Sequence, residues 1–173
     1  MGYTGGTTPD PTYTSLGDHS ESIQIEFDPT VVSYGELLTV FWQSHDPSTA
    51  PTCRQYMSAI YFHDEAQRQL AEQTKVVQEA AFGTTLHTEI RPVQTFYRAE
   101  DYHQKWYLRN HSVLQRDFQS IYPDARKLTD STAAARVNGV AGRHYTRARL
   151  EAEIDSFGLS AEANDLLRRL PTE

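Results

Sequence analysis

The stretch SIQIEF at residues 22–27 alternates polar and apolar side chains. A period of two predicts a β-strand with one buried face. The residues before it, 3–21, are rich in Gly, Thr and polar side chains and are expected to form a long loop. Asp28-Pro29 follows and is expected to end the strand. The first regular element is therefore expected at residues 22–27.

The spacing of apolar positions then changes to that of a helix. Ser33 and Glu36 form a capping-box pair ahead of apolar residues at helical spacing, and this helix is expected to stop near His45-Asp46-Pro47. Asp64 is placed to cap a longer, more polar helix that ends at Gly83. The sequence thus predicts two helices in the first half of the chain.

Further strands are expected on either side of the longer helix. Residues 56–62 are apolar at nearly every position, which predicts a central strand covered on both faces. Residues 88–97 read as a strand that Pro92 bends or places at an edge. Residues 100–110 are predicted to be a helix rich in aromatic side chains. The order β-α-β-α-β-α predicts a two-layer α/β (α+β) fold, with helices packed on a sheet.

The tail of the chain differs from the part before it. Helices are predicted at residues 130–140, at 147–157 with Thr146 as the cap and Gly158 as the stop, and from Ser160 onward. These three helices hold too few large apolar residues to fold alone, so they are expected to pack on the α/β body. We therefore predict an α/β domain at residues 1–127 and a helical C-terminal extension at residues 128–173.

Composition narrows the function classes. The 173 residues carry a formal charge of −7, which argues against a nucleic-acid partner because such proteins present a basic face. No apolar run approaches the roughly 20 residues of a membrane span, and nothing reads as a signal peptide. The single cysteine, Cys53, cannot build an internal disulfide framework and fits a reducing compartment. A soluble cytoplasmic protein without a membrane partner is expected.

Few residues are candidates for chemistry on the pattern alone. Glu21 lies at the mouth of the first predicted strand, where a carboxylic acid can donate a proton, although a solvated Glu fits as well. Tyr3 and Tyr56 are either hydrogen-bond donors in a site or core tyrosines, and Cys53 is either a nucleophile or an inert thiol. His45-Asp46 is either a base with its orienting partner or a turn. No metal-ligand spacing and no phosphate-binding loop is present, so no metal or bound cofactor is expected.

A series of short motifs changes this picture, because together they resemble the A-type peptide methionine sulfoxide reductases. Each motif is weak alone, but the ordered series is specific and extends from Gly2 to about Tyr122. The motifs, in order, are GYTGG (2–6), PTY (11–13), GDHSE (17–21), DP (28–29), SYGELLTVFWQSHDP (33–47), QYMSAIY (55–61) and AEDYHQKWYL (99–108).

The resemblance implies a reaction and a set of site residues. In that family a cysteine thiolate attacks the sulfur of methionine-S-sulfoxide while a carboxylic acid protonates the departing oxygen and two tyrosine hydroxyls hold it. Matched motif by motif, the resemblance implies that Glu21 is the acid and that Tyr3 and Tyr56 are the two tyrosines. It also implies an oxidised methionine substrate, free or in proteins, and thioredoxin or another external thiol as reductant, with no bound cofactor.

The departures from the family pattern are equally specific. The family keeps its nucleophile in Gly-Cys-Phe-Trp, at a first strand and first helix ahead of the motif matched by residues 2–6, and this sequence contains no such motif. The resemblance therefore predicts an N-terminally truncated form that lacks this strand and helix. Cys53 matches the nucleophile neither by motif nor by position, and the loop between Pro47 and Gln55 is shorter than usual.

Two functions from different classes remain open on this basis. The first is thiol-dependent reduction of methionine-S-sulfoxide, with activity expected to be absent in the chain as it stands. The second is a catalytically dead remnant, or the product of a truncated gene model, that binds oxidised methionine without reducing it. A weaker third is a different enzyme that uses Cys53.

Overall fold

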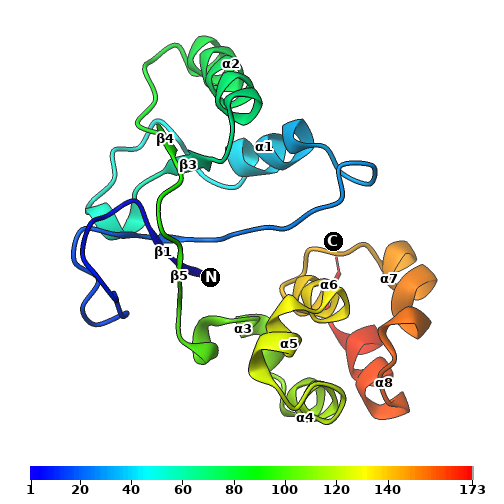
Figure 1. Cartoon of the computed structure of the whole chain (residues 1–173). Coiled ribbons are helices and arrows are strands. Elements are labelled where there is room, and N and C mark those ends of the chain that lie inside the picture. The colour runs from blue at the N-terminus through cyan, green and yellow to red at the C-terminus, as the bar shows by residue number, and fades with distance from the viewer. Residues whose placement is uncertain (173) are drawn as a thin grey trace. The chain divides into compact units, whose positions relative to one another are not determined.

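The structure, a computed structural model, describes residues 1–172. These residues form two compact units, the first from Met1 to Ala99 and the second from Glu100 to the end of the described chain. Figure 1 shows strands confined to the first unit and a series of helices in the second. The boundary predicted between residues 127 and 128 separates the family's core domain from a C-terminal extension. It stays a prediction.

A three-stranded antiparallel sheet holds the start of the chain. It consists of β1 (Gly2–Thr4), β2 (Ser20–Ser22) and β5 (Tyr97–Arg98), with β1 in the centre. In the register of β1 with β2, Tyr3 lies opposite Glu21. The stretch predicted as a loop therefore contains the central strand of this sheet, which its Gly and Thr content concealed.

A second, parallel sheet pairs β3 (Ala59–Phe62) with β4 (Glu89–Pro92), and Ile60 lies opposite Ile90. Helices α1 (Tyr34–Gln43) and α2 (Glu65–Phe82) pack on each other, and α2 contacts both strands. One apolar core joins the four elements, with Trp42 donating its Nε1–H to Thr74 Oγ1 at 3.0 Å. Its buried members are Leu38, Trp42, Ile60, Ala71 and Leu86.

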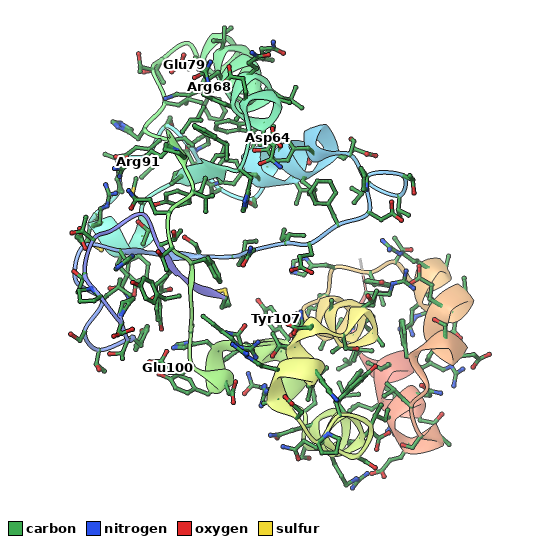
Figure 2. The ribbon with its side chains drawn as sticks, in the orientation of Figure 1. Asp64, Arg68, Glu79, Arg91, Glu100 and Tyr107 are labelled. Carbon is green, nitrogen blue, oxygen red and sulfur yellow. The ribbon has the colours of Figure 1, made fainter. Side chains whose placement is uncertain are left out.

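Local chemistry fixes both helices as predicted. Ser33 and Glu36 form the reciprocal capping box at the start of α1. Asp64 accepts a hydrogen bond from the Gln67 amide at the start of α2 (Figure 2), and Gly83, with φ +68°, ends that helix in the left-handed region. These predictions are confirmed.

The two sheets also approach each other through Gly5. This glycine has φ +82°, and the Tyr61 ring of β3 packs against its α-carbon in the space that a side chain would need. Any other residue there would meet both backbone strain and this ring. Gly5 thus lets the loop after β1 lie directly on the second sheet.

Two strand predictions in this unit are wrong. Residues 23–28 form no strand, because β1 pairs only with Ser20–Ser22 and the next residues have no ladder partner; Ile23 and Ile25 are 66% and 51% exposed. The predicted strand at 56–62 is shorter, because the 3-10 helix η1 (Arg54–Tyr56) precedes β3. Of the four residues of β3 only Ile60 is buried, so this strand is not covered on both faces.

The predicted strand at residues 88–97 is divided. Its first part is β4, in which Pro92 is the last residue, and its second part is β5 in the other sheet. Because proline cannot donate to a ladder, Pro92 suits the end of a strand at an edge, as expected. One stretch of sequence therefore serves both sheets of the unit.

The second unit is entirely helical in the part of it that the structure describes, and its helices share one apolar core. Lys105, with φ +50°, divides the helix predicted at residues 100–110 into a 3-10 turn and a short α-helix. The elements are η2 (Asp101–His103), α3 (Trp106–Arg109), α4 (Ser112–Ile121), α5 (Ala125–Asp130), α6 (Thr132–Ala141), α7 (Arg147–Glu153), η3 (Ile154–Phe157) and α8 (Ala161–Arg169).

The predicted C-terminal helices are confirmed, with Thr146 and Ser160 as side-chain caps and Gly158 in the left-handed region. Their packing partners come from within the second unit. Leu108 of α3 and Leu114 and Phe118 of α4 join the same core, so helices from both sides of residue 128 fold together. None of the helices among residues 1–172 is both long and apolar enough to cross a membrane.

Candidate active site

Glu21 occupies the middle of β2 and is half-buried. Its carboxylate accepts a hydrogen bond from Gln55 Nε2, with 2.7 Å between that nitrogen and Glu21 Oε1. A carboxylate only accepts hydrogen bonds, so the amide must present its nitrogen to Glu21. Two residues 34 positions apart in sequence are thus joined directly.

The 3-10 helix that carries Gln55 is anchored to the first sheet by its neighbour Arg54. The Arg54 guanidinium donates to the Gly5 carbonyl at 3.2 Å and to the Asp18 carbonyl at 3.3 Å. The Arg54 carbonyl accepts from Ser20 Oγ at 2.9 Å. Because these bonds reach both β2 and the loop before it, η1 is held where Gln55 meets Glu21.

Tyr56 ends η1 and presents its ring to solvent, being 59% exposed. The hydroxyl of Tyr13 beside it raises the pKa of Tyr56, and the Glu21 carboxylate and the Cys53 thiol raise the pKa of Tyr56 to a smaller extent. A raised pKa keeps the phenol protonated, so Tyr56 remains a hydrogen-bond donor throughout the neutral range. Tyr56 and Glu21 therefore interact electrostatically, and the catalytic roles that the resemblance implied for them stay predictions.

Tyr3 occupies a different environment. It lies opposite Glu21 in the β1–β2 register, and directly opposed residues of an antiparallel pair project to the same face of a sheet. Its side chain is 2% exposed and packs with Leu16 and Ala99. The structure brings the two backbones together but places the Tyr3 ring in this small core.

Two neighbouring residues order the loop that leads into β2. Asp18 accepts hydrogen bonds from the backbone N–H and the hydroxyl groups of both Thr7 and Thr8, and these bonds hold the pKa of Asp18 far below its ordinary value. His19 is 1% exposed; its Nδ1 accepts from the Gly6 N–H at 3.2 Å and its Nε2 donates to the Thr8 carbonyl at 2.7 Å. The bonds assign His19 the neutral Nε2–H tautomer and a structural role.

A cavity of about 720 Å³ opens beside Glu21. Gln55 and Tyr56 line it together with Glu21. The rest of its wall is mostly apolar, formed by the unpaired segment after β2, by α1 and by β3. The apolar side chains concerned are Ile23, Ile25, Phe27, Leu37, Val40 and Phe41. The alternating residues 23–27 thus contribute to a cavity wall instead of a buried strand face.

The remaining candidates lie elsewhere or act in the fold. Cys53 is exposed and directly precedes η1. It is not among the described residues that line the cavity. Asp46 accepts from the backbone and hydroxyl of Ser48, which confirms the turn at His45-Asp46. Among residues 1–172 no cluster of three or more His, Cys, Asp or Glu side chains is arranged to hold a metal ion.

The geometry defines a chemical capability. A carboxyl group and a phenol line one cavity whose remaining wall is mostly apolar. Such a site suits a small ligand that joins a polar oxygen to an apolar group, because both kinds of surface then find a partner. The carboxyl group is also placed to pass a proton to that oxygen.

Three residues of this arrangement were not predicted as site residues. Gln55 and Tyr13 lie inside the quoted motifs QYMSAIY and PTY, and Arg54 directly precedes the first of these. Their adjacency to motif tyrosines was the available signal. What the sequence did not contain was the contact of η1 with β2, which only the folded chain shows.

Comparison with known proteins gives a consistent assignment. The family described as peptide methionine sulfoxide reductase matches residues 1–136. The peptide methionine sulfoxide reductase of Drosophila melanogaster is 39% identical over 92% of this chain, and the chain covers 65% of that protein. MsrA of Methanococcoides burtonii is 46% identical over 62% of this chain and 77% of its own length. The chain thus spans about two thirds of the Drosophila protein.

Solved structures share the fold. Mxr1 from Saccharomyces cerevisiae in reduced form superposes with a TM-score of 0.60 and 27% identity, over 63% of this chain and 68% of that one. Methionine sulfoxide reductase A of Corynebacterium diphtheriae gives a TM-score of 0.54 and 33% identity, over 65% of this chain and 62% of that one. The predicted α/β class is therefore confirmed at this level, with mixed sheets and helices. On the match over residues 1–136, the chain belongs to the peptide methionine sulfoxide reductase family.

Proposed function

We propose that this protein acts in the thiol-dependent reduction of methionine-S-sulfoxide, and that the residues around Glu21 bind and protonate the sulfoxide oxygen. The observation that carries the proposal is the Glu21 carboxyl group, which Gln55 holds at the edge of a mostly apolar cavity that Tyr56 also lines. The cavity wall provides apolar surface for the methyl group and side chain of the substrate. The family assignment supports this choice of ligand.

The reaction divides into two balanced steps. In the first, a thiolate attacks the sulfoxide sulfur, the oxygen takes a proton from Glu21, and the products are a thioether and a sulfenic acid. The sulfoxide is reduced by two electrons and the thiolate is oxidised by two. In the second, thioredoxin or another thiol condenses with the sulfenic acid and releases water, and further thiol reduces the resulting disulfide. Glu21 recovers its proton from solvent.

The hydroxyl of Tyr56 acts in the first step as a donor to the same oxygen. Its raised pKa keeps the proton on the phenol, so the group stabilises developing negative charge without losing its own proton. Tyr3 is proposed as the second donor from the family match. Its ring packs against Leu16 and Ala99, on the sheet face that it shares with Glu21.

The thiolate is the component that these residues do not provide. Gly-Cys-Phe-Trp does not occur in the sequence, and Cys53, the single cysteine, lies outside the cavity lining of the described chain. That the chain is a shortened form stays a prediction. We therefore propose that the chain by itself binds the S-sulfoxide without reducing it. A remnant that only binds oxidised methionine is the second candidate function, favoured by the same observation.

Binding and turnover test these statements separately. N-acetyl-methionine amide S-sulfoxide is titrated into isotope-labelled protein, and the R epimer serves as the matched ligand. We expect the S epimer to shift the resonances of Glu21, Gln55 and Tyr56, and the R epimer to bind more weakly because the site fixes which face of sulfur is open. Equal binding of both epimers, or none of either, would refute the proposed recognition.

The catalytic role needs a thiolate at the cavity. The family's Gly-Cys-Phe-Trp segment is joined ahead of Met1, and release of methionine is followed in a single turnover. We expect reduction of the S epimer, and a 10²–10⁴-fold loss on Glu21→Gln, the range typical of a lost general acid. Glu21→Gln with a near-normal rate would remove Glu21 from the proton-donor role and leave the binding-only candidate.

A further inference from the structure

We propose that Gln55 is the positioning residue for the acid: it fixes which oxygen of Glu21 carries the proton and stabilises the carboxylate as that proton leaves. This inference rests on the proposed function, because it concerns the same acid. Nothing in the motif match assigns a role to Gln55. The argument comes from one hydrogen bond and from the anchors that hold its donor.

The hydrogen bond assigns the two oxygens different tasks. Gln55 Nε2 donates to Glu21 Oε1 over 2.7 Å, so the Oε1 lone pair is engaged. In a neutral carboxylic acid the carbonyl oxygen is a better acceptor than the hydroxyl oxygen, so the oxygen that accepts the Gln55 N–H is favoured as the carbonyl. The proton of the neutral acid therefore belongs on Oε2, and the Oε2–H group is the one left to meet a ligand in the cavity.

The donor is held in place from two sides. Arg54, next to Gln55 in η1, donates to carbonyls of Gly5 and Asp18, and Ser20 next to Glu21 donates to the Arg54 carbonyl. The acid and its donor are thus each flanked by a residue that joins β2 to η1. A substrate that enters the cavity finds the amide already aimed at Oε1.

The same bond gains strength during the reaction. Before proton transfer Oε1 belongs to a neutral acid, and after the Oε2 proton has moved to the sulfoxide oxygen it belongs to a carboxylate. Hydrogen bonds to an ionised acceptor are roughly twice as strong as those to a neutral one. The gain appears only as charge develops, so it lowers the barrier and not merely the energy of the bound state. We expect it to be worth about tenfold in rate.

A second amide–carboxylate pair in the chain provides the matched control. Gln69 Nε2 donates to Glu65 Oε1 at 3.0 Å on the exposed surface of α2, away from the cavity lining. Gln69→Met removes the same kind of hydrogen bond as Gln55→Met, with the same change of side-chain volume. Any effect specific to Gln55→Met therefore reports its place beside Glu21.

The test measures how binding of N-acetyl-methionine amide S-sulfoxide depends on pH. Binding to the wild type is expected to weaken as Glu21 loses its proton. Gln55→Met removes a donor that favours the carboxylate, so the pH at which half the binding is lost should move up. Gln55→Lys places a cation there and should move this pH down. Gln69→Met should follow the wild type.

Other titratable groups face the same site, so the inference depends on differences between variants. Tyr56 and Cys53 lie on or beside η1, Tyr13 comes from the facing loop, and His45 and His63 line the cavity wall. None of these side chains changes in the Gln55 variants. If the pH of half-maximal binding moves up in Gln55→Met and down in Gln55→Lys, the group that titrates is the one beside Gln55. A merely structural role for Gln55 predicts no such difference in direction between the two variants.

The outcomes separate this inference from the proposed function. Glu21→Gln should abolish the loss of binding that the wild type shows as Glu21 gives up its proton, and if that loss persists at the same pH the proposed acid itself is wrong. If Glu21→Gln abolishes it but the two Gln55 variants leave the midpoint unmoved, or shift it in one direction, the role of Gln55 is overturned. If either Gln55 variant fails to show a native unfolding transition, the test uses the wild-type protein instead. Its Gln55 side-chain amide resonances are followed as the pH changes, and they should move as Glu21 titrates. Resonances that stay fixed would overturn the inference.

Discussion

Arg54 is the residue through which the stability of the first unit and the geometry of the site are most directly coupled. Its guanidinium group makes two hydrogen bonds to backbone carbonyls, at 3.2 Å to Gly5 and 3.3 Å to Asp18, and an ion pair to Glu89 at 3.5 Å. Arg54→Met removes all three interactions and keeps the length of the apolar stem. The change tests whether η1 depends on these bonds for its position.

The magnitude follows from exposure. The side chains of Arg54 and Glu89 are 35% and 43% exposed, so their ion pair is worth at most about 0.5 kcal/mol after solvent screening. Gly5 is buried, and its carbonyl loses this partner at a cost of about 1–2 kcal/mol, while the exposed Asp18 carbonyl regains water. We expect Arg54→Met to lower the free energy of unfolding of the first unit by about 2 kcal/mol.

Arg91→Met is the matched control. Arg91 pairs with the same Glu89 at 3.4 Å and is 39% exposed, but it has no corresponding pair of bonds to the loop before β2. Its loss should cost about 0.5 kcal/mol or less. The difference between the two variants, about 1.5 kcal/mol, therefore measures the backbone bonds of Arg54.

The two tryptophans allow the first unit to be followed separately. Trp42 is buried in the first unit and Trp106 is exposed in the second, so a Trp106→Phe background makes fluorescence report the surroundings of Trp42. Urea unfolding gives the free energy and its dependence on denaturant for each variant. Sulfoxide binding is measured on the same proteins, and Arg54→Met should weaken it because Gln55 and Tyr56 lose their anchor. Equal costs for Arg54→Met and Arg91→Met, with unchanged binding, would refute the reasoning.

Three further predictions follow from separate parts of the chain. Hydrogen bonds lower the pKa of Asp18 in the folded protein, so its stabilising effect is present above its unfolded-state pKa of about 3.9 and is lost as the pH falls. Asp18→Asn should therefore lower the free energy of unfolding at pH 7. Urea unfolding at about pH 3 should show a smaller difference between this variant and the wild type. Methionine release by the chain as it stands, with dithiothreitol as reductant, should equal the background, and turnover that disappears in Cys53→Ser would contradict the view of this cysteine given above. Leu167 of α8 is fully buried, so Leu167→Ala should cost the second unit about 2–5 kcal/mol, measured as a shift of the transition that Trp106 reports; a shift below about 1 kcal/mol would show that α8 contributes little to this core.

The sequence by itself determined the features that depend on neighbouring residues. Helices start and stop at residues whose hydrogen bonds or backbone conformation involve only a few neighbouring positions. The starts are Ser33 with Glu36, Asp64 and Thr146, and the stops are Gly83 and Gly158. The ordered motifs also determined the family, because their identity and order do not depend on knowing the fold. The role implied for Glu21 came from that match and remains a prediction that its place in the cavity supports.

Only the tertiary structure decided which extended segments became strands. Alternation at residues 23–27 is a local pattern, but a strand needs a partner, and β1 pairs no further than Ser22. The short β1 inside a Gly-rich stretch was hidden for the converse reason, since its pairing comes from Glu21 and Tyr97, which are distant in sequence. The bond from Gln55 to Glu21 belongs to the same class: neither residue type nor spacing predicts a contact that exists because η1 packs on β2.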